Sequence, residues 1–187
     1  MDALLEIDAG IFLAIQGVAH ALPAIAPGIL FLGEWALYPI LAALAFIYIY
    51  AHGHRHTRLA HGVLLSLISA LVARFGVTEL LQNLFMRERP YLALDLPTLI
   101  QQPDYSFPSG HATFFFALAL SLYYTDRRLG VIMFLLAGFI SLARVMAGVH
   151  YPLDILAGAL VGLATAYAIH WAFNRHKGKA SGGRLKS

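Results

Sequence analysis

Five apolar runs, each long enough to cross a lipid bilayer, dominate this chain. They occupy residues 24–50, 58–86, 108–124, 129–149 and 152–173. A helix rises about 1.5 Å per residue and the hydrocarbon core of a bilayer is about 30 Å thick, so runs of this length can span it. Lipid-exposed backbone must satisfy its own hydrogen bonds, and continuous apolar runs do so as helices. The sequence therefore predicts an all-α integral membrane bundle with five transmembrane helices.

The composition agrees with a membrane protein. Hydrophobic residues make up 59% of the chain and charged residues only 12%, whereas about a quarter of a soluble domain is charged. The chain has no cysteine, which excludes disulfides and thiolate chemistry. We expect a single domain over residues 1–176 and a disordered basic tail over 177–187. Membrane lipids are expected partners, nucleic acid is not, and the oligomeric state stays open.

The first twenty residues predict an amphipathic helix. Leu4, Ile11 and Val18 recur at helical spacing, while Asp8 and Gln16 are polar. We expect this helix to lie in the membrane interface. A sixth span is the alternative, but it would put an acidic end without Lys or Arg on the cytoplasmic side, against the charge rule.

Basic residues indicate which side of the membrane each loop faces. Nine of the 13 Lys and Arg residues fall in three segments, 51–58, 125–128 and 174–187. Such an excess marks cytoplasmic segments. Alternation of the five spans then puts residues 87–107 and the 149–152 turn outside, with the C-terminus in the cytoplasm.

Three polar clusters stand at the outer ends of these runs: Arg89-Pro90, the segment 108–111, and Arg144 with His150 and Asp154. Ionisable residues at membrane segments are rare and usually mark a functional site. Because the predicted topology brings all three clusters to one face, we expect them to form one extracytoplasmic site.

The second cluster, Pro108-Ser109-Gly110-His111, is typical of a helix start that binds an anion. Its free backbone N–H groups can face a phosphate. His111 can give a proton to a leaving oxygen, since imidazole titrates near neutrality. An ordinary helix with a capping serine remains the alternative.

In the third cluster His150 and Asp154 are four residues apart. A carboxylate one turn away can hold one ring nitrogen and leave the other free as a base or nucleophile. The alternatives are a structural pair with Arg144 as counter-ion, or metal ligation together with His111. Two arginines beside the histidines favour an anion, so we expect neither metal nor another cofactor.

The first cluster should turn the chain outward, because a proline disfavours helix at the residue before it. Arg89 then points at the mouth of the site and Arg87 shares that mouth, although span-end arginines often only reach lipid headgroups. Besides Glu79, two further charges lie inside spans, Glu34 and Arg74. We expect them to pair with each other as part of the scaffold.

Taken in order, these motifs resemble the type 2 phosphatidate phosphatase superfamily over residues 82–154. The resemblance implies an enzyme that cleaves phosphate from lipid phosphates or diphosphates without metal. It also implies a role for each motif residue: nucleophile forming a phosphohistidine (His150), its orienting carboxylate (Asp154), general acid (His111), and phosphoryl ligands (Arg89, Ser109, Gly110 and Arg144).

Two positions depart from the superfamily pattern. Gln82 stands where the pattern has lysine, and Ala143 where it has serine. Gln82 can still donate hydrogen bonds to phosphate, without charge. On a regular helix Arg87 points about 140° away from residue 82, so it replaces the lysine only if Pro90 frays the last turn. In that case we expect Arg87 to bind the outer phosphate of a diphosphate.

The short core, the N-terminal helix, Glu34 and the missing lysine are most similar to bacterial bacitracin-resistance-type undecaprenyl-diphosphate phosphatases. That resemblance implies hydrolysis of undecaprenyl or another polyprenyl diphosphate to the monophosphate, at the outer face of the bacterial plasma membrane. Phosphatidylglycerophosphate, phosphatidate and lipid A are alternative substrates. A lipid-phosphate transporter is the alternative of another class.

Overall fold

The structure, a computed structural model, describes residues 2–182, which are helical with connecting loops and contain no strand. The N-terminal half comprises α1 (Asp2–Ala21), a 3-10 turn η1 (Pro23–Ile25), α2 (Ala26–Leu30), η2 (Phe31–Trp35), α3 (Leu37–Gly53), α4 (Thr57–Leu71), η3 (Val72–Thr78) and α5 (Glu79–Phe85). The C-terminal half comprises α6 (Pro90–Ala93), α7 (Gly110–Thr125), α8 (Arg127–Met146) and α9 (Pro152–Gly182). The segments η2 and η3 are π-helical.

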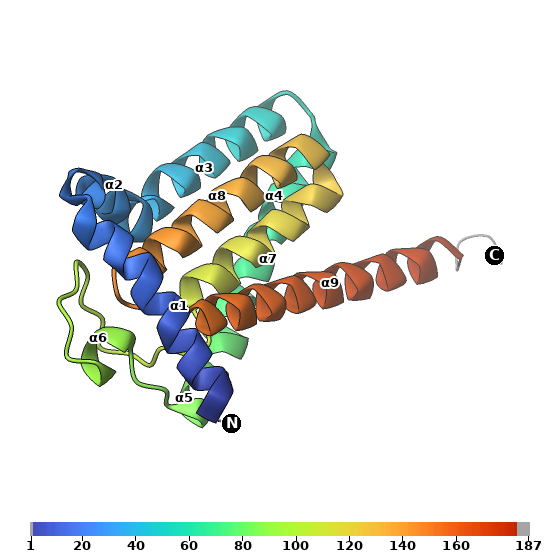
Figure 1. Cartoon of the computed structure of the whole chain (residues 1–187). Helices are drawn as coiled ribbons and strands as arrows, with labels where there is room; N and C mark the ends of the chain where they lie inside the picture. Colours follow the sequence, from blue (N-terminus) through green and yellow to red (C-terminus); the bar gives the residue numbers. More distant parts are fainter. Residues whose placement is uncertain (1, 183–187) are drawn as a thin grey trace.

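Helix α7 is the centre of the bundle and packs against α4, α8 and α9 (Figure 1). Its Phe115 and Leu118 are almost completely buried. Two glycines of α9 allow the closest approach: a Cβ at Gly158 would lie 2.5 Å from the Ser109 carbonyl oxygen, and one at Gly162 would lie 2.3 Å from that of Thr113. Small residues four apart are typical of helix pairs in membranes.

Large apolar side chains cover the outside of the bundle. Phe46, Leu135 and Leu160 are each more than 60% exposed, and such a surface is suited to lipid rather than water. Within the described residues, four helical runs are long and apolar enough to cross a membrane: Ala3–Ala21, Thr57–Ala93, Arg127–Met146 and Pro152–Arg175. A bent pair, Pro23–Trp35 with Leu37–Gly53, raises the number to five. The predicted all-α membrane bundle is confirmed.

Three details differ from the sequence-based expectation. The first span is bent by 52° between Trp35 and Leu37. Helix α7 has only 16 residues, fewer than the other spanning candidates, and protein surrounds it on several sides. Helix α9 continues to Gly182, so it includes the beginning of the segment 177–187 for which we expected disorder. Residues 183–187 of that segment lie outside the described residues.

Helix α1 lies across the ends of α8 and α9 (Figure 1). It is amphipathic as expected, but the polar residues Asp8 and Gln16 face the protein together with Phe12, whereas the apolar Leu4 and Val18 are at least half exposed. A helix that packs its polar side chains against protein and exposes its apolar side chains is suited to contact lipid. The length of α1 also permits a span, so its interfacial position stays a prediction.

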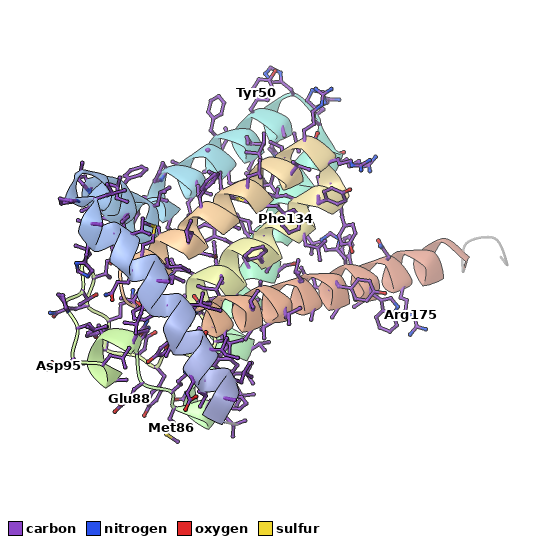
Figure 2. All side chains as sticks on the ribbon, in the orientation of Figure 1. Tyr50, Met86, Glu88, Asp95, Phe134 and Arg175 are labelled. Carbon is purple, nitrogen blue, oxygen red and sulfur yellow. The ribbon has the colours of Figure 1, made fainter. Side chains whose placement is uncertain are left out.

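The basic loops and the loop that follows α6 lie at different ends of the bundle (Figure 2). Tyr50 and Arg175 mark one end, near the α3–α4 connection and the last turns of α9. Glu88 and Asp95 mark the opposite end, where α6 and the long loop from Leu94 to Ser109 lie. The basic segments and the three polar clusters are therefore at opposite ends.

Candidate active site

Three short structural features bring the predicted site residues together. Arg89 precedes the first turn of α6, Ser109 is the N-cap of α7, and Arg144 lies in the last turn of α8. His150 occupies the tight turn into α9, whose first turn carries Asp154. The long loop 94–109 closes over this end and supplies further polar contacts.

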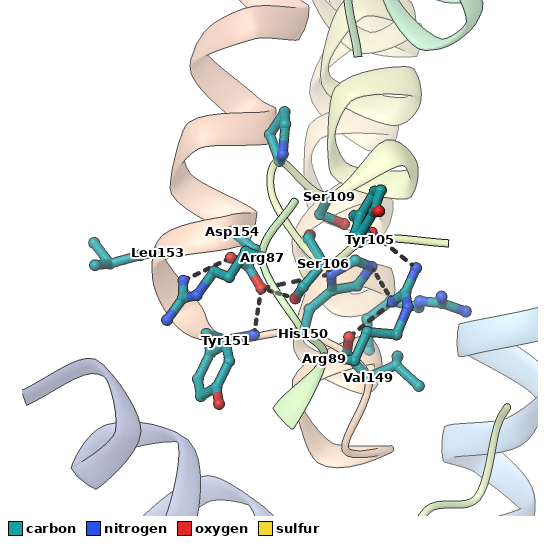
Figure 3. Close-up of polar contacts among 12 residues, drawn as sticks. Arg87, Arg89, Tyr105, Ser106, Ser109, Val149, His150, Tyr151, Leu153 and Asp154 are labelled. Carbon is teal, nitrogen blue, oxygen red and sulfur yellow. Dashed lines mark hydrogen bonds and ion pairs between the residues drawn. The ribbon is translucent and has the colours of Figure 1, made fainter. Parts of the chain in front are cut away.

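The imidazole of His150 is almost completely buried and held from both sides (Figure 3). Its Nδ1 lies 3.0 Å from the Ser106 carbonyl oxygen and its Nε2 lies 3.3 Å from Nη1 of Arg89. A carbonyl can only accept and a guanidinium can only donate, so Nδ1 carries the proton and Nε2 presents a lone pair. Burial, followed by the charges of Arg144 and Arg89, lowers the pKa of His150 well below its usual value. The ring is therefore neutral at pH 7, with the lone pair of Nε2 unprotonated.

Asp154 does not hold His150 directly, which corrects the expectation of a simple His–Asp pair. Its Oδ2 lies 3.7 Å from Nδ1, too far for a hydrogen bond. That oxygen instead accepts from the Ser106 hydroxyl and, at 2.8 Å, from the Tyr151 N–H. Asp154 therefore positions Ser106, and the Ser106 carbonyl fixes the tautomer of His150.

Arg87 lies on the far side of Asp154, away from Arg89 (Figure 3). Its guanidinium makes 2.7 Å ion pairs with Asp154 and with Asp8 of α1, and lies 3.9 Å from the ring centre of Tyr151. Asp8 also accepts from the Leu153 N–H at 2.9 Å. The expected swing of Arg87 towards a phosphate is not seen. We call Asp8, Arg87, Ser106 and Asp154 the closed network.

Gln82 is also occupied by protein groups. Its Nε2 is 3.1 Å from the carbonyl oxygens of both Tyr105 and Pro108, so it anchors the end of the long loop and has no free donor aimed at a ligand. Ala143, the second departure, is buried in an apolar cluster with Ile29 and Ile100. Neither residue restores the contact that the superfamily pattern has at its position.

Arg89 is 1% exposed and is directed by carbonyl groups towards His150. It donates to the carbonyl oxygens of Asp104 and Val149, both at 2.8 Å, and to the Asp104 carboxylate at 2.5 Å. A carboxylate thus already occupies an anion position at Arg89, next to His150.

Arg144 is fully buried behind the residues that face the site. It donates to the Gly33 carbonyl at 2.9 Å and to the Gln102 side chain at 2.5 Å, and lies 3.4 Å from the Glu34 carboxylate. The predicted pair of Glu34 with Arg74 is therefore wrong. Arg74 lies instead 3.6 Å from Glu79 and 3.7 Å from Asp104.

The start of α7 agrees only in part with the predicted anion cradle. The Ser109 hydroxyl caps the helix by accepting from Ala112, and the Ser109 N–H donates to the Asp154 carbonyl at 3.0 Å, so that N–H is not available to a ligand. Gly110 and His111 are the first helical residues, whose N–H groups have no carbonyl partner within α7. Of the backbone N–H groups of Ser109, Gly110 and His111, which we expected to face a phosphate, the last two thus remain suitable for an anion.

Two adjoining hollows meet at this helix start. We call the first the polar cavity; it measures about 400 Å³ and is lined mainly by charged and polar residues, namely Glu34, Arg74, Arg89, Gln101, Gln102, Pro103, Asp104, Gly110, His111 and His150. The second, the apolar groove of about 440 Å³, is lined by Leu37, Leu41, Leu67, Leu71, Arg74, Phe75, Gly110, His111, Phe114 and Phe115. Arg74, Gly110 and His111 line both. The predicted residues His111, Arg89, Gly110 and His150 face the polar cavity; Asp154, Ser109, Arg144, Gln82 and Arg87 do not line it.

Sequence reasoning missed four participants: Asp8, Gln102, Asp104 and Ser106. Only Asp8 carried a signal, since it shares one helix face with the apolar Phe12. The other three lie in the long loop, whose path no sequence periodicity specifies. Within the described residues, no group of three His, Asp or Glu side chains has the geometry of a metal site.

Comparison with known proteins agrees with this architecture. The PAP2 superfamily matches residues 61–177. The bacitracin transport permease protein BcrC of Bacillus licheniformis is 29% identical over 89% of this chain and 80% of its own length. The undecaprenyl-diphosphatase BcrC of Bacillus subtilis is 30% identical over 84% of this chain and 79% of its own length.

A solved structure is similar in fold. The crystal structure of the transmembrane PAP2 type phosphatidylglycerolphosphate phosphatase from Bacillus subtilis has a TM-score of 0.70 at 22% identity, covering 94% of this chain and 88% of that one. The chain belongs to the PAP2 superfamily and is a multi-pass membrane lipid phosphatase.

Proposed function

We propose that this enzyme hydrolyses undecaprenyl diphosphate, or a closely related polyprenyl diphosphate, to the monophosphate and inorganic phosphate. The observation that carries the proposal is the junction of the apolar groove with the polar cavity at His111, with the Nε2 lone pair of His150 at the end of the path. A prenyl tail suits the groove and a charged headgroup suits the cavity. The similarity to an undecaprenyl-diphosphatase of Bacillus subtilis supports this substrate.

The first chemical step forms a phosphohistidine. Nε2 of His150 attacks the terminal phosphorus, and the bond from phosphorus to the bridging oxygen breaks with its electron pair on the leaving lipid phosphate. His111 gives that oxygen a proton. Arg89 and the N–H groups of Gly110 and His111 bind the oxygens of the phosphoryl group in flight, while Arg144 adds positive charge from behind Gln102.

The second step releases phosphate. A water molecule loses a proton to His111 and attacks the phosphorus, and the P–N bond breaks and returns its electron pair to Nε2 of His150. Asp104 occupies the anion position in the structure, so the substrate replaces its carboxylate at Arg89. Because arginine and backbone donors supply the positive charge, the mechanism proposed needs no metal.

The reaction faces the outside of the membrane in this proposal, with the C-terminus in the cytoplasm. Support comes from the basic segments at the end of the bundle opposite the polar cavity. Single cysteines at Ala93 and His54, both exposed and at opposite ends, should react with an impermeant thiol reagent from opposite sides of intact cells. Ala93→Cys should react outside; reaction of His54→Cys outside would invert the proposed topology.

Phosphate release by the purified enzyme from a panel of lipids tests the substrate. We expect the highest kcat/KM for undecaprenyl diphosphate, undiminished by EDTA and lost in His150→Ala. Higher values for phosphatidylglycerophosphate, phosphatidate or lipid A would transfer the proposal to that substrate. Movement of a lipid phosphate across vesicles without phosphate release would instead indicate a transporter.

A further inference from the structure

We propose that Arg74 binds the inner phosphate of the diphosphate, the one joined to the lipid tail, and thereby selects diphosphates over monophosphates. This inference rests on the proposed function and names a contact within the same site. The motifs that identify the superfamily do not include Arg74, and the sequence alone favoured a scaffold role for it.

Position is the first argument. Arg74 lines both the apolar groove and the polar cavity. Its guanidinium packs against the start of α7 so closely that a Cβ on Gly110 would lie 2.4 Å from its Nε. A lipid whose tail fills the groove and whose terminal phosphate reaches His150 must place its inner phosphate between them, beside Arg74.

The contacts of Arg74 are the second argument. Its partners Glu79 and Asp104 lie at 3.6 and 3.7 Å, beyond hydrogen-bond distance. Among the described residues, its buried Nη1 has no hydrogen-bond partner. A buried guanidinium donor without a partner is unfavourable, and a phosphate oxygen would satisfy it. Arg87, by contrast, makes two ion pairs at 2.7 Å and has no such vacancy.

Asp104 gives the third argument, because one carboxylate joins two arginines. Its Oδ1 is 2.5 Å from Arg89 and its Oδ2 is 3.7 Å from Arg74. The two guanidinium groups therefore converge on a single anion. A diphosphate that displaces Asp104 can therefore place one phosphate at each arginine.

The backbone gives the fourth argument. Arg74 lies in the π-helical segment η3, and Glu34, which also lines the polar cavity, lies in the π-helical segment η2. Such segments are rare and frequently occur at functional sites. Each interrupts a spanning helix at the depth of the cavity, so both interruptions place a charged side chain at the substrate.

Chemistry predicts which substrates depend on Arg74. Cleavage of a diphosphate leaves a lipid phosphate as the leaving group, whose negative charge rises as the P–O bond breaks, and a neighbouring guanidinium stabilises that charge. Cleavage of a monophosphate ester leaves an alcohol, which also takes the proton from His111 but has no inner phosphate for Arg74 to bind.

The test compares two non-hydrolysable inhibitors with the same tail, farnesyl methylenediphosphonate and farnesyl phosphonate, by calorimetric titration of the purified enzyme. Arg74→Gln should weaken binding of the diphosphonate by about 10- to 100-fold, the size expected for loss of a charge-assisted contact. The affinity for the monophosphonate should differ from that of the wild-type enzyme by less than about threefold, because this inhibitor has no inner phosphate and loses no contact. Arg74→Lys, which keeps the charge but not the planar fork, should be intermediate.

Arg128→Gln is the matched control, since Arg128 is exposed at the opposite end of the bundle and should change neither affinity. Equal weakening of both inhibitors by Arg74→Gln, or of neither, would overturn the inference. Because binding is measured without turnover, that outcome is distinct from failure of the proposed hydrolysis, which would show as absence of phosphate release. Arg74→Lys keeps the test decisive if Arg74→Gln does not fold.

Discussion

Behind His150, the charges of the closed network are joined at 2.7 Å, whereas in front of it the charges of the polar cavity are separated by up to 3.7 Å. Arg87 pairs with both Asp8 and Asp154, so its charge is balanced by protein groups. Arg74, which lines the cavity, retains a buried nitrogen without a hydrogen-bond partner among the described residues, and so does Arg144 behind it. Arg87, which is fully paired, therefore holds the structure together, whereas the incompletely paired Arg74 is the arginine that we propose for the inner phosphate.

The largest effect expected within the closed network is that of Asp154→Asn. Because the Ser106 carbonyl, rather than Asp154, contacts His150, we expect kcat to fall about 100-fold, less than the roughly 10⁴-fold loss when a triad carboxylate that bonds the histidine directly is changed to Asn. Steady-state kinetics measure this. A loss of about 10⁴-fold would indicate that Asp154 orients His150 directly during catalysis.

Arg87→Ala should distinguish a structural arginine from a substrate-binding one. It leaves Asp8 and Asp154 without their shared partner, and breaking a buried ion pair costs about 3–5 kcal/mol. We expect a lower melting temperature in detergent and a fall in kcat of about tenfold, equal for diphosphate and monophosphate lipids, since the effect reaches His150 only through Asp154. Selective loss of diphosphate hydrolysis would restore the idea that Arg87 binds the outer phosphate.

Asp104→Asn should improve substrate binding, whereas the two preceding substitutions reduce activity. In the proposed mechanism its carboxylate competes with substrate for Arg89, to which it is paired in the structure, so loss of that charge should lower KM by about fivefold, corresponding to about 1 kcal/mol. Because the Asp104 side chain is 40% exposed, we expect the substitution to change the stability of the fold only slightly. An increase in KM would show instead that the carboxylate positions Arg89 for substrate.

The smallest expected effect is a shift in the pH dependence of kcat/KM, caused by the lowered pKa of His150. Burial and two arginines lower the pKa of His150 below 6.5, so the neutral nucleophile persists as pH falls past that value and is lost only below the lowered pKa. The second ionisation of the substrate phosphate, near pH 6, also changes kcat/KM and must be corrected for. After that correction, kcat/KM should begin to fall only below pH 6.5 as the solution is acidified. A limb at or above 6.5 would mean that His150 has an ordinary pKa in the free enzyme.

The fold was predictable because membrane-length apolar runs permit few structures, and the motif residues assembled because the spans alternate in direction. Contacts within the site were less predictable. Arg74 and Arg87 could be placed only within a turn or two of a helix, and the π-helical segment at Arg74 and the end of α5 before Arg87 changed their directions. Ser106 and Asp104 belong to a loop held by the Gln82, Arg89 and Asp154 side chains, contacts that connect residues far apart in sequence.

Covalent labelling shows whether His150 carries the phosphoryl group between the two chemical steps. Enzyme mixed rapidly with undecaprenyl diphosphate carrying a radioactive terminal phosphate should be quenched in alkali during the first turnover, because a phosphohistidine is stable in alkali and labile in acid. We expect acid-labile label on His150 that appears before free phosphate and is absent from His150→Ala. Two results would contradict a phosphohistidine on His150. One is release of phosphate without an initial burst and without label on the protein; the other is label that persists in His150→Ala.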